Sequence, residues 1–406
     1  DELARVAWSD MFAASAAEKL QQAKATCELL AKRYTCVVAN PPYMGSSSFS
    51  PFMSKWVKKN YPDVKSDLFS SFIVRIMGLA NDHGECGIMC PFVWMFIGSY
   101  EKLRNEIIDN RTFTSLIQLE YSGFAGATVP ICTYTFHNSF IKGYKGGYVR
   151  LSDFVGTAVQ APKALEAIRN PDCGWFYRRD AETFKQIPGT PIAYWVGEGL
   201  LNAFSKGRPI RDFFITASKG IFTGDNARFL RLWHEVGFLE INRGWQLYAK
   251  GGAYRKWYGN VDYVVNWYND AAELRRFKGS GLSPSRYFGS PTYTWSKISS
   301  SYAAFRYNHG SVFFDDASPA FVFGEGEEQE KRRFLAFANS SISSAALSLI
   351  APTLNYQTGD VGNLPILSMD SEGGPINLLT KQNIAMSKSD WDSFETSWDF
   401  KHHPLV

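Results

Sequence analysis

The sequence predicts an α/β protein in which an open, mostly parallel sheet is followed by a second domain of different composition. Strand-like apolar runs alternate with helical stretches through residue 137, which is typical of a mostly parallel sheet. Aromatic residues make up 16% of the chain and cluster late, together with basic charge. The chain has 406 residues, 45% of them hydrophobic, so it can bury a sizeable core over two or three domains.

The run over residues 34–39 predicts a buried, inner parallel strand. It stops at Asn40-Pro41-Pro42-Tyr43, where the two prolines exclude both ladder pairing and helix. In an open α/β sheet, ligands bind in the crevice beyond the carboxyl ends of the strands. We therefore expect Asn40 and Tyr43 to project into that crevice.

The chemistry of this tetrapeptide suits a planar ligand that carries an exocyclic amine. The Asn40 side chain offers a carbonyl acceptor and an NH2 group, and the main-chain carbonyls of Asn40 and Pro41 lack strand partners. The Tyr43 ring offers a face on which such a ligand can stack. A plainer interpretation is a proline-rich strand exit in which Asn40 caps a turn.

The elements around this strand alternate as the fold class requires. Helices are predicted at residues 4–33, 68–79 and 100–108, and strands at 88–91, 115–120 and 129–137. Asp67 is placed to cap the second of these helices, and residues 84–87 predict a turn. Lys55, Lys58 and Lys59 suit contact with a nucleic-acid backbone and suit a solvated surface equally well.

Several function classes are disfavoured by what the sequence lacks. No apolar run has the length of a membrane helix, and the six cysteines and six histidines form no zinc-binding pattern. The first residues contain no signal peptide, so we expect a cytoplasmic protein. No Gly-rich strand-to-helix turn followed by an acidic residue precedes Asn40, so the usual cofactor-binding turn is missing there.

A second domain is predicted to begin near residue 191, after a proline-containing linker over residues 161–190. Residues 191–300 contain 15 Lys and Arg against 8 Asp and Glu, an excess larger than that of the whole chain. The segment 245–267 interleaves basic and aromatic side chains, as expected of a surface that holds phosphates and stacks on bases. An aromatic β core with basic edges is the alternative.

Segments in both halves of the chain resemble known methyltransferases. In order, 40–43, 66–69, 84–91 and 124–133 resemble motifs IV, V, VI and VIII of adenine-N6 DNA methyltransferases. Four later segments are similar to the recognition region of the PglX methyltransferases of BREX phage-defence systems: 219–226, 251–260, 294–299 and 352–360. PglX proteins are much larger and carry a Gly-rich cofactor motif upstream, so the chain resembles their middle to C-terminal portion.

This resemblance implies a partial Rossmann-like methyltransferase sheet followed by an α+β target-recognition domain. Residues 1–160 would be the C-terminal part of the catalytic domain, from motif IV onward, and 161–190 the linker. The DNA target-recognition domain would cover 191–366, and 367–406 would form a polar C-terminal extension.

The resemblance further implies site-specific methyl transfer from S-adenosylmethionine to N6 of an adenine flipped out of double-stranded DNA. The side-chain oxygen of Asn40 and the carbonyl of Pro41 would accept the two N6 hydrogens, and Pro42 completes the motif. Tyr43 would stack on one face of the base and Phe124 on the other. The residues that would flank the methionine end of the cofactor are Asp67, Leu68 and Phe69.

DNA contacts are expected from basic and aromatic residues of the second domain: Lys219, Arg228, Arg231, Lys250, Tyr254, Arg255, Lys256, Trp257 and Lys297. The resemblance suggests other BREX defence proteins as partners, and it requires neither a metal nor a membrane. Two alternatives remain at this stage. One is a protein glutamine-N5 methyltransferase, which carries the same tetrapeptide. The other is a non-catalytic DNA-recognition module of a restriction-modification or BREX complex.

Overall fold

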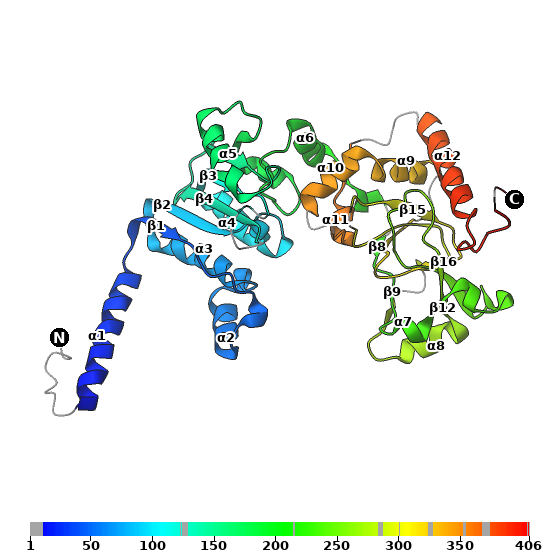
Figure 1. The fold of residues 1–406 in the computed structure, drawn as a ribbon, viewed down its shortest axis with the longest axis horizontal. Helices are drawn as coiled ribbons and strands as arrows, with labels where there is room; N and C mark the ends of the chain where they lie inside the picture. Colours follow the sequence, from blue (N-terminus) through cyan, green and yellow to red (C-terminus); the bar gives the residue numbers. More distant parts are fainter. Residues whose placement is uncertain are drawn as a thin grey trace. The chain divides into compact units, whose positions relative to one another are not determined.

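The computed structural model describes residues 11–406 except 122, 124–128, 214–215, 283–286, 300, 324–327, 352–354, 368–373, 404 and 406. The chain divides into two compact units (Figure 1). Unit 1 comprises Asp1–Lys185 and Gly189–Val196, and unit 2 comprises Gln186–Pro188 and Gly197–Val406. Among the described residues, no helix has both the length and the apolar character needed to cross a membrane.

Unit 1 is built on a six-stranded sheet with the order β1-β2-β4-β3-β5-β6. Its strands are β1 (Tyr34–Ala39), β2 (Ala80–Pro91), β3 (Thr112–Gln118), β4 (Ile131–His137), β5 (Lys145–Arg150) and β6 (Phe176–Asp180). Pairing is parallel between β1 and β2 and between β3 and β5, whereas β4 is antiparallel to both of its neighbours and β6 is antiparallel to β5. Four strands therefore point the same way, with a reversed β4 inserted among them.

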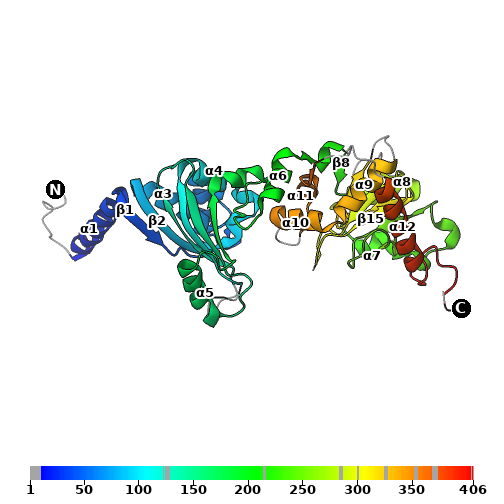
Figure 2. The same cartoon turned by 90° about the horizontal axis from the view of Figure 1, so that it is seen from above.

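The helices of unit 1 are α1 (Met11–Ala31), α2 (Pro51–Asn60), α3 (Leu68–Leu79), α4 (Glu101–Asn110) and α5 (Thr157–Arg169). Figure 2 shows α3 and α4 on one side of the sheet and α5 on the other. The predicted cap of α3 is confirmed, because the Asp67 side chain accepts a hydrogen bond from the Phe69 amide. The helix predicted over 4–33 is confirmed from Met11 to Ala31, and residues 4–10 lie outside the described residues.

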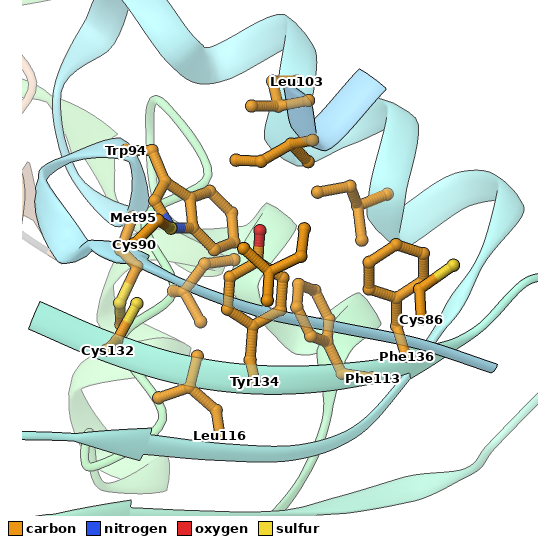
Figure 3. Close-up of a cluster of buried hydrophobic side chains, with 14 of the residues drawn as sticks. Cys86, Cys90, Trp94, Met95, Leu103, Phe113, Leu116, Cys132, Tyr134 and Phe136 are labelled. Carbon is orange, nitrogen blue, oxygen red and sulfur yellow. The ribbon is translucent and has the colours of Figure 1, made fainter. Parts of the chain in front are cut away.

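The core of unit 1 lies between the sheet and the helices α3 and α4, and it is rich in aromatic rings (Figure 3). Trp94 packs on Tyr134 with ring centroids 4.9 Å apart and on Phe113 at 6.3 Å. All three side chains are fully or nearly fully buried. Burying rings of this size contributes much of the apolar surface that stabilises a sheet-and-helix layer.

Two predictions about this sheet are wrong in detail. The strand 34–39 exists, but it is the outermost strand of the described sheet, and its Val38 side chain is 75% exposed. An apolar run does not reveal whether partners lie on both sides of a strand, because pairing is non-local. The predicted turn at 84–87 is part of β2, whose backbone pairs with β1 on one side and β4 on the other.

The predicted linker over 161–190 is also wrong, because most of this segment is built into unit 1. The second half of α5 buries Ala167 against the sheet, and β6 pairs with β5. Residues 191–195, expected to begin the next domain, belong to unit 1 as well. Tyr194 is buried there, stacked on Tyr148 at 5.0 Å, and its hydroxyl donates to Gln118 Oε1 at 2.8 Å.

Unit 2 is an α+β structure with two four-stranded sheets. Their orders are β10-β12-β11-β16 and β15-β14-β17-β8, beside the two-stranded pairs β13-β9 and β18-β7. The strands are β7 (Arg208–Pro209), β8 (Thr216–Ser218), β9 (Ile221–Phe222), β10 (Leu230–Leu232), β11 (Trp245–Ala249), β12 (Tyr263–Asn266), β13 (Gly281–Leu282), β14 (Thr292–Trp295), β15 (Phe305–Asn308), β16 (Val312–Phe314), β17 (Ala320–Val322) and β18 (Pro365–Ile366). The helices are α6 (Glu198–Lys206), α7 (Asn226–Phe229), α8 (Tyr268–Arg276), α9 (Glu328–Ala338), α10 (Ser341–Ile350), α11 (Thr358–Gly362) and α12 (Gly374–Trp391).

The end of the chain, predicted as a polar extension over 367–406, is largely helical in the structure. Its helix α12 packs against α9 within unit 2. Trp391 at the end of α12 is buried, and Lys388 bridges Asp392 and Asp399, with a 2.5 Å separation from each. A polar composition therefore did not distinguish a docked helix from a solvated tail.

Candidate functional site

The tetrapeptide 40–43 lies directly beyond the carboxyl end of β1, as predicted. Pro41 is buried, whereas Asn40 and Tyr43 are exposed. The Tyr43 hydroxyl donates a hydrogen bond to Asn40 Oδ1 at 3.2 Å, so the two side chains converge on one point. Tyr43 as a whole is 39% exposed, so a flat ligand can reach it.

Asp67 anchors this loop as well as capping α3. Its Oδ1 accepts from the Met44 amide at 3.1 Å and from the Phe69 amide at 3.2 Å. The Leu68 amide donates to the Met44 carbonyl at 2.9 Å, and Gly45 forms a β-bridge with Asp67. One carboxylate therefore joins the loop after Tyr43 to the start of the next helix.

These contacts define what the three residues expected beside a cofactor do in this structure. The Asp67 carboxylate is engaged with main-chain amides, and Leu68 is half-buried. The Phe69 side chain is 1% exposed and packs in the core, with its ring 5.9 Å from that of Tyr100. The Phe69 side chain consequently serves packing, which corrects its expected place against a ligand.

Two buried thiols influence Tyr43 electrostatically. Cys90 of β2 and Cys132 of β4 are directly opposite one another in register, and both are fully buried. Burial raises the pKa of the Cys90 thiol well above its ordinary value, so it stays protonated. Burial, together with these two thiols, also raises the pKa of Tyr43.

Two further expectations concern groups that the site would need. Phe124, expected on the second face of the ligand, lies outside the described residues. Among the described residues, β1 has a strand partner on one side only, which is β2. Within the described ranges, no group of three His, Cys, Asp or Glu side chains is placed to hold a metal ion.

The basic residues expected to contact DNA in unit 2 are mostly engaged within the unit. Arg228 binds Glu273 Oε1 through Nε and Nη2, at 2.8 and 2.6 Å. Lys297 forms a 2.9 Å ion pair with Asp316. The ammonium group of Lys256 donates to the Asn339 main-chain carbonyl at 2.7 Å.

Three of the four remaining expected cations also have contacts within unit 2, and the fourth, Lys219, is exposed. Arg231 donates to two main-chain carbonyls at 2.6 Å, and Lys250 lies 5.0 Å from the centre of the Tyr263 ring. Arg255 stacks over Trp391 at 4.8 Å and lies 3.9 Å from Asp390. Lys219 is exposed at the surface.

The two aromatic residues of this set differ in their exposure. Tyr254 is 48% exposed, whereas Trp257 is half-buried and has a φ of 74°. The Trp257 amide and carbonyl both pair with the backbone around β15, so the residue belongs to the framework of the sheet. Tyr254 is therefore the ring of the pair that a base can reach most readily.

Sequence reasoning missed a polar cavity of about 710 Å³ at α8. Its lining includes the exposed cations Arg276 and Lys278, for which the described residues provide no ion pair, together with Tyr268 and Asn269. Asn269 and the next two residues have φ values of 52–58°, a left-handed turn that side chains rarely adopt. No pattern in the sequence marks this turn, since neither glycine nor proline occurs in it.

Comparisons with known proteins agree with this arrangement. Residues 5–124 match the family model of the Eco57I restriction-modification methylase. The chain is 34% identical over 399 residues to the adenine-specific methyltransferase PglX of Lacticaseibacillus casei (strain Zhang), which covers 93% of the chain and 33% of that protein. Over this portion the chain is similar to the adenine-specific methyltransferase PglX.

A second PglX relative gives the same result. The adenine-specific methyltransferase BrxX of Escherichia coli O9:H4 (strain HS) is 34% identical over 406 residues, 95% of the chain and 32% of that protein. The chain thus spans about a third of the length of these PglX relatives.

Solved structures show the fold of this portion. The type IIL restriction-modification enzyme MmeI, solved in complex with DNA, superimposes with a TM-score of 0.56 at 10% identity, over 90% of the chain and 50% of MmeI. A nuclease-deletion mutant of the type ISP enzyme LlaGI superimposes with a TM-score of 0.54 at 11% identity, over 91% of the chain and 36% of LlaGI. The predicted fold class, a partial methyltransferase sheet followed by an α+β region, is confirmed.

Proposed function

We propose that the chain carries the base-binding and DNA-recognition portions of a site-specific DNA adenine-N6 methyltransferase of a phage-defence system. The observation that carries this proposal is the loop at the end of β1, where the side chains of Asn40 and Tyr43 converge. The PglX match supports adenine as the base and S-adenosylmethionine as the methyl donor.

In this proposal the loop holds the exocyclic amine of an extruded adenine. Asn40 Oδ1 and the Pro41 carbonyl accept its two hydrogens, which are the only donors that the amine has. These acceptors become more favourable as positive charge develops on the nitrogen, so they stabilise the transition state more than the bound base. The cytosine amine has the same pair of hydrogens, so discrimination between the bases rests on the shape of the pocket.

Tyr43 has two contributions in this proposal. Its ring stacks on the base, and its hydroxyl occupies one lone pair of Asn40 Oδ1 before the base arrives. The phenol is neutral at physiological pH, as an ordinary tyrosine is, and its raised pKa keeps it neutral in more alkaline solution as well, so it places no negative charge beside the base. Entry of the adenine amine exchanges the Tyr43 hydrogen bond for its own.

Unit 2 supplies the recognition of DNA in this proposal, as the target-recognition domain. Its support is the MmeI-like fold over 90% of the chain and the exposed groups Lys219, Tyr254, Arg276 and Lys278. Other BREX proteins would be its partners, and its DNA substrate would place it in the cytoplasm.

A non-catalytic recognition module is the second candidate, and one observation favours it. The described residues before Asn40 contain no Gly-rich strand-to-helix turn of the kind that holds a cofactor. The PglX relatives are about three times as long as the chain, so a whole protein of that size has room for a cofactor-binding part that these residues do not form.

The test is calorimetric titration of the chain with S-adenosylmethionine, with and without unmethylated phage DNA of mixed sequence, followed by transfer of a labelled methyl group. Methylation that is lost in Asn40→Ala, with DNA affinity unchanged, would support the methyltransferase. DNA binding without cofactor binding or methylation, found for the full-length protein that contains the chain as well as for the chain itself, would support the recognition module. Methyl transfer to protein that does not require DNA would favour the glutamine methyltransferase and contradict the proposal.

A further inference from the structure

The helix α2 follows soon after the loop that carries Asn40 and Tyr43. It begins after Ser50, whose hydroxyl accepts from the Met53 amide at 3.2 Å, and Pro51 occupies its first position. Hydrogen bonds hold the two ends of the segment 46–66, which contains α2, close together. The Ser46 amide donates to the Ser66 carbonyl at 2.9 Å, next to the hydrogen bond between the Met44 amide and Asp67.

The two faces of α2 have different roles. Val57 is buried and holds the helix on unit 1. On the other side, Phe52 is 80% exposed and Trp56 is 47% exposed, one helical turn apart. Lys55 and Lys59 are exposed and share this face, because positions separated by three, four and seven residues lie on the same side of a helix.

Folding of unit 1 does not account for this face. Lys58 and Lys59 lie in the last turn of α2, where cations favour the helix dipole, but Lys55 is outside that turn. Within the described residues, none of the three lysines forms an ion pair. Phe52 and Trp56 together form an exposed aromatic pair that folding of unit 1 leaves in water, and adjoining exposed apolar side chains of this kind often mark a binding surface.

We infer that the exposed face of α2 is a DNA-contact surface that engages the duplex beside the extruded nucleotide. Lys55 and Lys59 meet phosphates, while Phe52 and Trp56 stack on bases that extrusion has unstacked. The choice of nucleic acid as the occupant follows from charge: the helix carries three lysines and no acidic residue. The inference rests on the proposed function, because it takes the neighbouring loop to hold the extruded base.

The shared anchor gives this contact a second effect. Since Asp67 fixes both the loop after Tyr43 and the base of the α2 segment, binding of α2 to DNA holds Asn40 at a constant distance from the duplex. Positioning of this kind converts DNA binding into orientation of the reacting base. In Figure 1 the helix projects from unit 1 below α3, away from the sheet.

The experiment compares DNA binding by variants of the full chain, measured by fluorescence anisotropy. The probes are a labelled duplex and the same duplex with one unpaired adenine, each titrated at several salt concentrations. For Phe52→Ala we expect affinity for the unpaired-adenine duplex to fall about 5- to 150-fold, the range of one lost stacking contact. Its salt dependence should not change, because no charge is removed.

Replacing the lysines, unlike replacing Phe52, should change the salt dependence of binding. In Lys55→Ala/Lys59→Ala, the slope of log affinity against log salt should become shallower by about 1.8, because two phosphate contacts are lost. The matched controls are Phe140→Ala and Lys142→Ala. Both residues are exposed, Phe140 by 41%. They follow the last residue of β4, His137, which pairs with Glu85 in the first half of β2. They therefore lie at the end of the sheet opposite Asn40, so these variants should bind DNA as the wild-type chain does.

Each outcome decides the inference. If Phe52→Ala and the lysine pair bind both duplexes as their controls do, α2 does not contact DNA and its exposed face belongs to another partner. In that case the proposed function stands whenever the wild-type chain still binds DNA and Asn40→Ala still abolishes methylation. A wild-type chain that binds neither duplex would overturn the inference and the DNA-directed function together. Thermal unfolding identifies folding defects, and the 80% exposure of Phe52 predicts an unchanged Tm.

Discussion

The loop at the end of β1 and the basic region of unit 2 differ in how their side chains are used. In the loop, the side chains of Asn40 and Tyr43 are hydrogen-bonded to each other, and both residues are exposed, so a ligand can reach them. In unit 2, most of the predicted DNA-binding cations already have partners, among them Glu273 for Arg228 and Asp316 for Lys297. A count of charges in a sequence therefore overstates the charge that is available to a polyanion.

Replacement of Asn40 should have the largest effect and tests the first half of this comparison. Asn40→Ala removes one of two acceptors for the adenine amine, and losing one such transition-state contact typically lowers the rate about 100- to 1,000-fold. The measurement is the rate of methyl transfer to phage DNA, made in a preparation whose wild-type form is active. Asn202→Ala, in α6 of unit 2, is the matched control. Equal rates for the two variants would show that Asn40 does not touch the reacting group.

One pair of cations and one single lysine in unit 2 test the second half. In Arg276→Ala/Lys278→Ala, two cations at the α8 cavity that form no ion pair within the described residues are lost, so the salt slope of DNA binding should become shallower by about 1.8. Lys297→Ala should leave that slope unchanged, because Asp316 already neutralises this lysine. Anisotropy titrations at several salt concentrations measure both. The reverse ranking would mean that the ion pair with Asp316 opens on DNA and that the original prediction for Lys297 was right.

The anchor between the loop and α3 should have a moderate effect on stability. Asp67→Ala removes the helix cap and the bond to the Met44 amide, so we expect a loss of about 1–2 kcal/mol in the free energy of unfolding. Urea denaturation measures it. Asp67→Asn keeps an acceptor oxygen and should recover most of the loss, whereas equal losses in both variants would assign the effect to charge.

The smallest effect should come from the hydroxyl of Tyr43. Tyr43→Phe keeps the stacking ring but frees Asn40 Oδ1, so affinity for a duplex with an unpaired adenine should rise about 2- to 12-fold, the worth of one hydrogen bond. Tyr43→Ala should weaken the same binding, because it removes the ring. A weaker Tyr43→Phe variant would indicate that the hydroxyl contacts the base.

Local signals in the sequence predicted the local parts of this structure. The apolar run 34–39, the prolines after it and the Asp67 cap each depend on neighbours in the chain, and each is found where expected. The position of β1 at the sheet edge depends on which strands pair with it, and the assignment of 161–190 depends on β6 reaching β5. Neither relation leaves a mark in a short window of sequence.

The candidate site was predictable to a similar extent. Motif resemblance placed Asn40 and Tyr43 together, but it also placed Phe69 beside a ligand when its ring packs in the core. Composition found the basic character of unit 2 without its internal ion pairs, which join residues such as Arg228 and Glu273 that are 45 positions apart. The exposed aromatic face of α2 was visible only once burial was known for each side chain.

The place of β1 at the margin of its sheet has a practical consequence for work with this polypeptide. An edge strand presents a row of unpaired backbone donors and acceptors, and β1 also presents the exposed side chains of Cys36 and Val38. Such a strand is a template for pairing with a second copy, which is the first step of aggregation. Pairing of β1 across two copies brings apolar surface and thiols together, so concentrated samples should self-associate and, in air, acquire intermolecular disulfides through Cys36. Val38→Lys, which places a charge on this margin, is the substitution to introduce before crystallisation.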